Sequence, residues 1–172
     1  MAQEAKRLHN FRAQDEAARW RKVNDGVMGG LSQSEMVFTS QGTAVFRGRV
    51  SLENDGGFAS VRTTPQDYEV GGYEGLAVRV KGDGHRFKLR LRTNDRFDSP
   101  AYQADFDTVT DAWITVRVPF SAFVATFRGR QLRDAPPLDS AQIRQIGFLI
   151  ADKQAGPFQL EIDWINAYKS AR

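Results

Sequence analysis

The sequence contains no cysteine and only two histidines, His9 and His85. Without cysteine there is no disulfide framework and no thiolate chemistry, and two isolated histidines offer few ligands to zinc. No apolar run approaches the roughly 20 residues that a membrane-spanning helix needs, and residues 1–20 lack the apolar segment of a signal peptide. From these absences we predict a soluble, cytoplasmic protein that has no transmembrane segment and binds no metal or cofactor.

A concentrated excess of positive charge is also missing. Of the 24 basic and 21 acidic side chains, six basic and three acidic ones lie in residues 1–22, which leaves 18 of each sign in the rest of the chain. Nucleic-acid-binding proteins usually present a concentrated basic surface. The charge balance therefore predicts that nucleic acid is not a partner.

The motifs of common catalytic sites are absent as well. There is no Gly-x-Ser-x-Gly sequence to form a nucleophile elbow, and the glycine-rich stretch 23–32 does not end in the Gly-Lys-Ser/Thr of a phosphate-binding loop. Asp105 and Asp107 would stand about 6.8 Å apart on one strand face, near the carboxylate spacing of inverting glycosidases. Such a pair arises easily by chance among 21 acidic residues, so we predict that the protein is not an enzyme.

Short runs of alternating apolar and polar residues make up most of what is present. Residues 75–81 and 85–93 alternate most clearly, and Gly82-Asp83-Gly84 between them predicts a tight hairpin. Similar runs follow one another throughout residues 34–168, separated by Gly, Asn, Asp and Pro. The pattern predicts an all-β protein, an antiparallel β-sandwich or jelly roll of about nine or ten strands with little helix.

The first 19 residues lack this alternation. Leu8 and Phe11 have the spacing of one helix face, but no further apolar residue extends the pattern. We therefore predict a helix or a flexible arm for residues 1–19 and a single β-sandwich domain for residues 20–172.

Four predicted strands, 75–81, 85–93, 101–107 and 112–118, project polar side chains to one side. If these strands are neighbours, they form one polar face of basic, acidic and amide groups with an outward tryptophan. A solvated outer sheet face is the ordinary interpretation of such a surface. The sharper hypothesis is a binding surface flanked by the glycine-rich stretch. Its candidate residues are Asn24, Asp25, Arg90, Arg92, Gln103, Asp105, Trp113 and Arg117.

Two ligand classes suit this predicted face. In a protein contact, the arginines would pair with carboxylates or carbonyls, and Trp113 would supply apolar area. In a carbohydrate contact, Trp113 would stack on a sugar ring while the acids and arginines bind its hydroxyl groups. Calcium would need Asp25 and Asp163 to meet, and solvated or turn-capping carboxylates explain these two residues more simply.

Three stretches of the sequence resemble one protein family. They are Trp20 with Val23-Asn24-Asp25-Gly26-Val27-Met28-Gly29-Gly30-Leu31-Ser32, then residues 50–62, and Arg79-Val80-Lys81-Gly82-Asp83-Gly84. Trp113 and Pro119-Phe120 continue the match, which runs in order from about residue 20 to residue 168. The chain is therefore similar to the complex I intermediate-associated protein 30 family.

The resemblance implies a galactose-binding-domain-like jelly roll, in agreement with the strand pattern. Mitochondrial members of this family act as chaperones in the assembly of respiratory complex I, which implies a protein partner such as a membrane-complex subunit. The family offers no catalytic residues to transfer to this chain. We therefore predict a non-enzymatic binding domain that works as an assembly factor or chaperone-like protein. The alternative is a carbohydrate-binding module that uses the same polar face.

Overall fold

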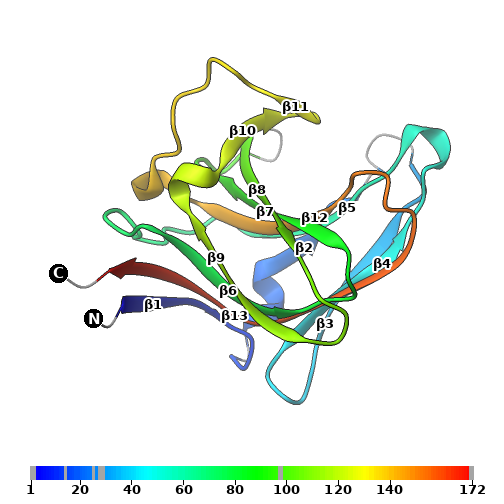
Figure 1. Cartoon of the computed structure of the whole chain (residues 1–172), viewed down its shortest axis with the longest axis horizontal. Coiled ribbons are helices and arrows are strands. Elements are labelled where there is room, and N and C mark those ends of the chain that lie inside the picture. Colours follow the sequence, from blue (N-terminus) through cyan, green and yellow to red (C-terminus); the bar gives the residue numbers. More distant parts are fainter. Residues whose placement is uncertain (1–2, 14, 25, 27–29, 97–98, 171–172) are drawn as a thin grey trace.

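Two antiparallel β-sheets face each other across one core in the computed structural model, which describes residues 3–13, 15–24, 26, 30–96 and 99–170 (Figure 1). The strands of sheet A are β1 (Gln3–Asn10), β3 (Gln33–Phe38), β4 (Ala44–Val50), β6 (Gly75–Lys81), β9 (Trp113–Pro119) and β13 (Gly156–Ser170). The strands of sheet B are β2 (Trp20–Lys22), β5 (Ala59–Thr63), β7 (Arg86–Arg92), β8 (Ala101–Asp107), β10 (Val124–Phe127), β11 (Arg130–Gln131) and β12 (Gln145–Ile150).

The order of strands is β3-β4-β13-β6-β9 in sheet A, with β1 also paired to β13, and β11-β10-β8-β7-β12-β5-β2 in sheet B. This arrangement confirms the predicted all-β antiparallel sandwich. The described residues form thirteen strands, more than the nine or ten predicted. Three of the additional strands, β2, β10 and β11, have four residues or fewer, too few to show a period of two.

The helices in the described residues are short 3-10 turns between strands. They are η1 (Glu16–Arg19), η3 (Glu53–Asp55), η4 (Phe120–Ala122) and η5 (Ser140–Gln142). None of the described helices has the length and apolar character needed to cross a bilayer.

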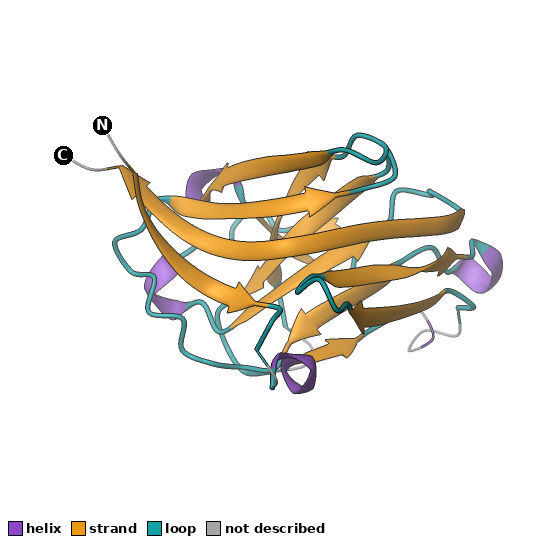
Figure 2. Ribbon diagram, turned by 90° about the horizontal axis from the view of Figure 1, so that it is seen from below, coloured by secondary structure: helices purple, strands orange, loops and turns teal. Residues whose placement is uncertain are grey.

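The N-terminal segment differs from its prediction, because residues 3–10 form strand β1 and not a helix or a flexible arm. β13 is 15 residues long, and β4 pairs with it only as far as Ile162. β1 pairs with the remaining half of β13 and so satisfies backbone groups that β4 leaves open. Edge strands accept charged residues such as Lys6 and Arg7, which explains why the sequence shows no apolar alternation there. Figure 2 accordingly shows both chain ends at the same end of the sandwich.

The core lies between the two sheets and follows the alternation of apolar residues. The inward positions predicted for residues 75–81 and 85–93 are confirmed, because these side chains have no exposed surface: Leu76, Val78, Val80, Phe87, Leu89 and Leu91. Full burial of each such side chain contributes about 1.5–3 kcal/mol. Since each strand turns one set of alternate residues to this core, the other set forms the two outer faces of the sandwich.

Candidate functional site

The four strands of the predicted polar face belong to different sheets. β6 and β9 pair in sheet A, whereas β7 and β8 pair in sheet B. The turn at residues 82–84 does not close a hairpin, because it carries the chain from one sheet to the other. The expected single face is therefore divided between opposite sides of the sandwich. Sheet A carries Trp113 and Arg117, and sheet B carries Arg90, Arg92, Gln103 and Asp105.

Charges on the outer face of sheet A are paired with one another. Arg79 Nε lies 3.3 Å from Asp163 Oδ2, and Lys81 Nζ lies 3.5 Å from Glu161 Oε1. Both cations also lie over the Trp113 ring, at 5.1 Å and 5.4 Å from its centroid. Such cation–π contacts are worth about 0.5–1 kcal/mol at exposed sites. Trp113 is thus part of a local cluster whose charges already have partners.

The other predicted residues on the outer face of sheet A do not form a ligand-binding site with one another among the described residues. The Arg117 guanidinium lies 6.0 Å from the ring centroid of Tyr168. Asp25 lies outside the described residues, and Asp163, its suggested calcium partner, is engaged by Arg79. Within the described ranges, no group of three or more histidine and acidic side chains could hold a metal ion.

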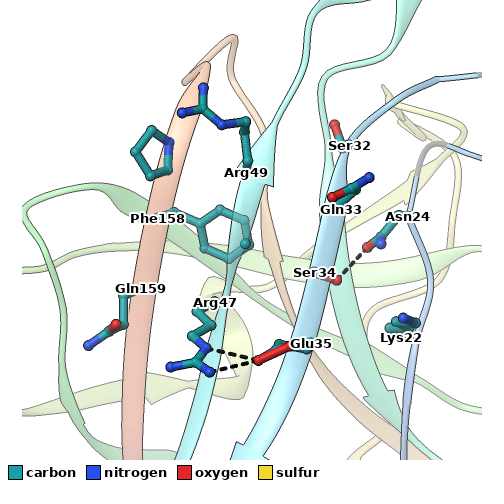
Figure 3. A pocket seen from close by; sticks show the side chains of 12 residues that line it. Lys22, Asn24, Ser32, Gln33, Ser34, Glu35, Arg47, Arg49, Phe158 and Gln159 are labelled. Atoms are coloured by element: carbon teal, nitrogen blue, oxygen red, sulfur yellow. Dashed lines mark hydrogen bonds and ion pairs between the residues drawn. The ribbon is translucent and has the colours of Figure 1, made fainter.

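Asn24 lines a shallow groove of about 890 Å³ at the edge of the sandwich (Figure 3). Its Oδ1 accepts hydrogen bonds from Ser34 Oγ at 2.8 Å and from the backbone N–H of Ser60 at 3.2 Å. Asn24 therefore ties β3 of sheet A to β5 of sheet B. Arg47 and Glu35 in the same groove form an ion pair at 2.8 Å. These contacts favour a structural role for Asn24.

A row of basic side chains crosses the outer face of sheet B. The strand register places one residue from each of five neighbouring strands side by side, in the order Gln103, Arg90, Gly147, Arg62 and Arg21. We call these five residues the arginine row. Their strands are β8, β7, β12, β5 and β2; of these, only β7 and β8 are consecutive in the sequence.

Acidic residues lie on one side of the arginine row and are held by cations. Lys88 Nζ lies 2.7 Å from Asp105 Oδ1 and 3.1 Å from Asp152 Oδ2. Arg86 Nε lies 2.8 Å from Asp107 Oδ1. The two carboxylates considered as a glycosidase pair, Asp105 and Asp107, are therefore each engaged in an ion pair.

Arg92 and Gln145 lie opposite each other on the other side of the row. Gln145 is 1% exposed, and its Nε2 donates to the carbonyl oxygens of Asn94 at 2.9 Å and Arg96 at 3.1 Å. The Oε1 of Gln145 is buried and has no hydrogen-bond partner in the part of the chain that the structure describes. A buried acceptor without a partner is uncommon in folded proteins.

Arg90 is the most unusual member of the arginine row. Its Nε is buried, and the guanidinium forms no hydrogen bond or ion pair with a described residue. Burial lowers the pKa of Arg90 to about 10, and the positive charge of Arg62 adds to this shift. Arg62 is itself only 4% exposed. A desolvated charge without a partner opposes folding, and a nearby anion would relieve that cost for Arg90.

The residues predicted from the sequence overlap with the arginine row in part. They include Arg90 and Gln103 of the row and the neighbouring Arg92, but not Arg21, Arg62 or Gly147. Arg62 occupies an outward position of the predicted strand 58–63, so the alternation alone predicts which side of the sheet it faces. The alternation does not predict that Arg62 lies near Arg90, because this depends on β12 pairing between β5 and β7.

The fold and this site define a galactose-binding-domain-like β-sandwich with candidate binding residues on an outer sheet face. A similar solved structure is the family 11 carbohydrate-binding module of a cellulosomal cellulase of Clostridium thermocellum, with a TM-score of 0.71, 19% identity, and coverage of 99% of this chain and 97% of that one. The same module in complex with a mixed-linked tetrasaccharide gives a TM-score of 0.69 at 19% identity, covering 95% of this chain and 94% of that one. At this level of identity the likeness establishes the fold alone.

The chain belongs to the complex I intermediate-associated protein 30 family, whose profile matches residues 9–162. The resemblance seen in the sequence is therefore confirmed. The mouse mitochondrial complex I intermediate-associated protein 30 is 27% identical, over 96% of this chain and 57% of its own length. The Drosophila melanogaster protein of the same name is 28% identical, over 92% of this chain and 61% of its own length. This chain thus spans about three-fifths of each relative.

The same comparison corrects the predicted cytoplasmic location. The relatives from mouse, Drosophila melanogaster and Caenorhabditis elegans are named as mitochondrial proteins. The prediction rested on the absence of cysteine, of a membrane-spanning run and of the apolar segment of a secretory signal peptide. A lack of cysteine fits any reducing compartment, and a secretory signal does not direct proteins to the mitochondrion, so these absences do not distinguish the cytoplasm from the mitochondrion.

Proposed function

We propose that this chain is a non-enzymatic protein-binding domain that contributes to the assembly of a membrane complex. The observation that carries the proposal is the family match over residues 9–162. The relatives are named for their association with intermediates of complex I, and association with an assembly intermediate requires contact with protein subunits. We assign the same kind of role to this chain, which corresponds to about three-fifths of each relative.

The outer face of sheet B is the contact surface in this proposal. Arginine is among the residues that most often dominate protein interfaces, and it binds carboxylates through two parallel hydrogen bonds. Arg90 has no such partner among the described residues. On the opposite side of the sandwich, Arg79 and Lys81 are already paired with carboxylates. A protein partner therefore gains more by contacting sheet B.

A carbohydrate-binding role is the second candidate, favoured by the likeness of the fold to carbohydrate-binding modules. Sugar recognition usually needs an aromatic ring that can stack on the sugar. The outward residues of the described sheet B strands include no aromatic side chain, and the Trp113 ring of sheet A is covered by two cations. Protein binding is therefore the better-supported function.

The non-enzymatic part of the proposal is supported by the carboxylates on the same face. Asp105 is bound by Lys88 at 2.7 Å, and Asp107 is bound by Arg86 at 2.8 Å. The hydrogen bond from Arg86 lowers the pKa of the Asp107 carboxyl, which makes this carboxylate a weaker base. Both carboxylates are already held by cations, which supports a non-enzymatic role.

Co-purification of membrane-complex subunits tests the proposal. The tagged wild-type chain and its Arg90→Met and Arg117→Met variants would each be expressed in cells of the source organism from which the endogenous gene has been deleted. Assembly of complex I would be followed on native gels. We expect complex I subunits to co-purify with the wild type and with Arg117→Met, and their recovery to fall about tenfold or more with Arg90→Met. Absence of any membrane-complex subunit from the wild-type sample would contradict the proposal.

A further inference from the structure

Strand β9 is an open edge of sheet A. Among the described strands only β6 pairs with it, so β9 ends the sheet on that side (Figure 1). The two edges of sheet B are β11 and β2, which have only two and three residues, and such short strands are a common protection of an edge. β9 has seven residues, and its pairing with β6 runs without a register shift. This edge therefore has the length and regularity that a further strand needs for pairing.

The strand register shows which backbone groups of β9 face away from β6. Pro119 lies opposite Gly75 and has no N–H group, so this pair is of the non-hydrogen-bonded type. The hydrogen bond from the N–H of Phe120 to the carbonyl oxygen of Glu74, 2.8 Å long, agrees with this assignment. Because the two types alternate along an antiparallel ladder, the even-numbered residues of β9 bond to β6. The N–H and C=O groups at the open edge belong to Trp113, Thr115 and Arg117. No described residue bonds to these groups.

Apolar side chains at the same edge are incompletely covered. The inward residues Val78 and Val80 of β6 have no exposed surface. Their neighbours in β9, Val116 and Ile114, stay half-buried although they also face the core. Neither of these edge residues is charged, whereas an inward-pointing charge is one of the devices that protect an edge strand. A further strand beside β9 would remove apolar surface of Ile114 and Val116 from water, which favours pairing.

We propose that β9 pairs antiparallel with β9 of a second copy of this chain, around a two-fold axis at Thr115. Thr115 then lies opposite its own copy, and Trp113 lies opposite Arg117 of the partner subunit. Since Trp113 and Arg117 are equally far from Thr115, every outward N–H and C=O group of these three residues finds a partner. A shift of the register by two residues in either direction would leave some of these groups unpaired.

The side chains also favour this register. Arg117 faces an aromatic ring and not a second Arg117, so no like charges stand directly opposite each other. On the inner side Ile114 faces Val116, which pairs two β-branched side chains. A contact through a single strand is small among protein–protein interfaces, so we expect a dimer that dissociates on dilution through the micromolar range. The dimer leaves the outer face of sheet B free, and it does not depend on the proposed function.

Cysteine cross-linking tests the register. The chain contains no cysteine, so one introduced cysteine reports on one contact. In Thr115→Cys the two-fold axis places the two Cα atoms about 5.5 Å apart, within the range of a disulfide. Arg117→Cys is the matched control on the same edge, because its two copies would stand about 13–14 Å apart along the strands. With oxidised glutathione as the oxidant, we expect Thr115→Cys to give at least about fivefold more disulfide-linked dimer than Arg117→Cys on non-reducing gels.

Sedimentation velocity over about 1–200 µM protein measures the dimer itself. Thr115→Pro removes an N–H group that points to the open edge and keeps the ladder to β6, a position where edge strands accept proline. Thr115→Lys places two like charges opposite each other. Val124→Lys is the matched control, since it adds the same charge at an exposed strand position of sheet B. We expect both Thr115 variants to weaken dimerisation at least about tenfold, and Val124→Lys to change it by less than about twofold.

Three outcomes would overturn the inference. A wild type that stays monomeric over the whole concentration range would exclude the dimer. A dimer that both Thr115 variants leave unchanged would place the interface on another surface. Equal cross-linking of Thr115→Cys and Arg117→Cys would show chance collisions and not the proposed register. Circular dichroism melting curves check that the variants fold. Because the Thr115 side chain is exposed, we expect Thr115→Lys to melt like the wild type, so this variant decides the result if Thr115→Pro is unfolded.

Discussion

The two outer faces of the sandwich carry similar residues in different electrostatic states. On sheet A, Arg79 and Lys81 each have a carboxylate partner and share the Trp113 ring. On sheet B, Arg90 is largely desolvated beside Arg62 and has no partner among the described residues. Exposed ion pairs contribute little to stability, whereas an unpartnered buried charge opposes folding. The difference indicates that the charges of Arg79 and Lys81 are balanced within sheet A, while the charge of Arg90 on sheet B is balanced by no described residue.

The largest effect is expected in a third cluster, which is buried as Arg62 is and whose polar side chains contact one another. Glu16 Oε2 lies 2.9 Å from His9 Nδ1 and accepts a hydrogen bond from Trp20 Nε1 at 2.6 Å. His9 and Glu16 are both buried. Glu16→Ala should lower the free energy of unfolding by about 3–5 kcal/mol, because it leaves buried groups without their partner. Urea denaturation near neutral pH measures this change.

The matched control is the exposed ion pair of Arg47 and Glu35 on sheet A, at 2.8 Å. Glu35→Ala should lower the free energy of unfolding by less than about 1 kcal/mol. If Glu16→Ala and Glu35→Ala lower the free energy of unfolding equally, burial does not determine how much a charged pair contributes to stability. The contrast between the two outer faces would then lose its physical basis.

Arginine-to-methionine substitutions on the two faces should change stability in opposite directions. Arg90→Met removes a desolvated charge without a described partner, so it should raise the free energy of unfolding by about 1–3 kcal/mol. Arg79→Met removes the contact with Asp163 and the cation over Trp113, so it should lower the free energy of unfolding by about 1 kcal/mol or less. The same urea titration measures both variants. A loss of stability in Arg90→Met would show that its guanidinium has a stabilising partner.

Trp113 tests whether the outer face of sheet A takes part in binding. Trp113→Ala removes the ring that Arg79 and Lys81 cover and should lower the free energy of unfolding by about 1–2 kcal/mol. It should leave the co-purification of complex I subunits unchanged within about twofold, because the ring lies on the opposite side of the sandwich from the arginine row. A larger loss of co-purified subunits would extend the binding surface to sheet A.

The sequence identified most of the longer strands but did not show which strands are neighbours in the sheets. Alternation in residues 75–81 and 85–93 correctly separated inward from outward residues, because burial of one strand face leaves a period of two in the chain. Which strands are adjacent depends on crossovers between sheets, and a period of two does not encode them. Gly82-Asp83-Gly84 has the composition of a hairpin turn and yet joins the two sheets. Trp113 was therefore grouped with Arg90 although the core lies between them.

Strand β1 was missed for a related reason. Its partner is the second half of β13, more than 150 residues away in the sequence. The strand is an edge strand with several charged residues, so its own pattern carries little signal. Arg62 was not among the predicted residues because only the pairing of β5 with β12 and of β12 with β7 brings it near Arg90.

The smallest predicted effect concerns an exposed pair on the outer face of sheet B itself. A hydrogen bond from Arg86 Nε to Asp107 Oδ1, 2.8 Å long, lowers the pKa of the Asp107 carboxyl, and the charge of Arg86 acts in the same direction. Because the pKa is lower in the folded than in the unfolded chain, the pair stabilises the protein above the unfolded pKa, and this contribution is lost as the pH falls through the folded pKa. Arg86→Gln should therefore lower Tm slightly near neutral pH and not at strongly acidic pH.

Melting curves of the wild type and Arg86→Gln across this pH range also sharpen the comparison of the two faces. Arg86 and Arg90 lie on the same strand and point to the same side of sheet B, but Arg86 is exposed and paired whereas Arg90 is largely desolvated. We expect Arg86→Gln to lower Tm slightly near neutral pH, and Arg90→Met to raise the free energy of unfolding. Together these results would show that Arg90 differs from Arg86 because it is buried without a described partner, and not because it lies on sheet B. A Tm difference that persisted at acidic pH would instead show that Arg86 stabilises the protein through contacts other than the Asp107 carboxylate.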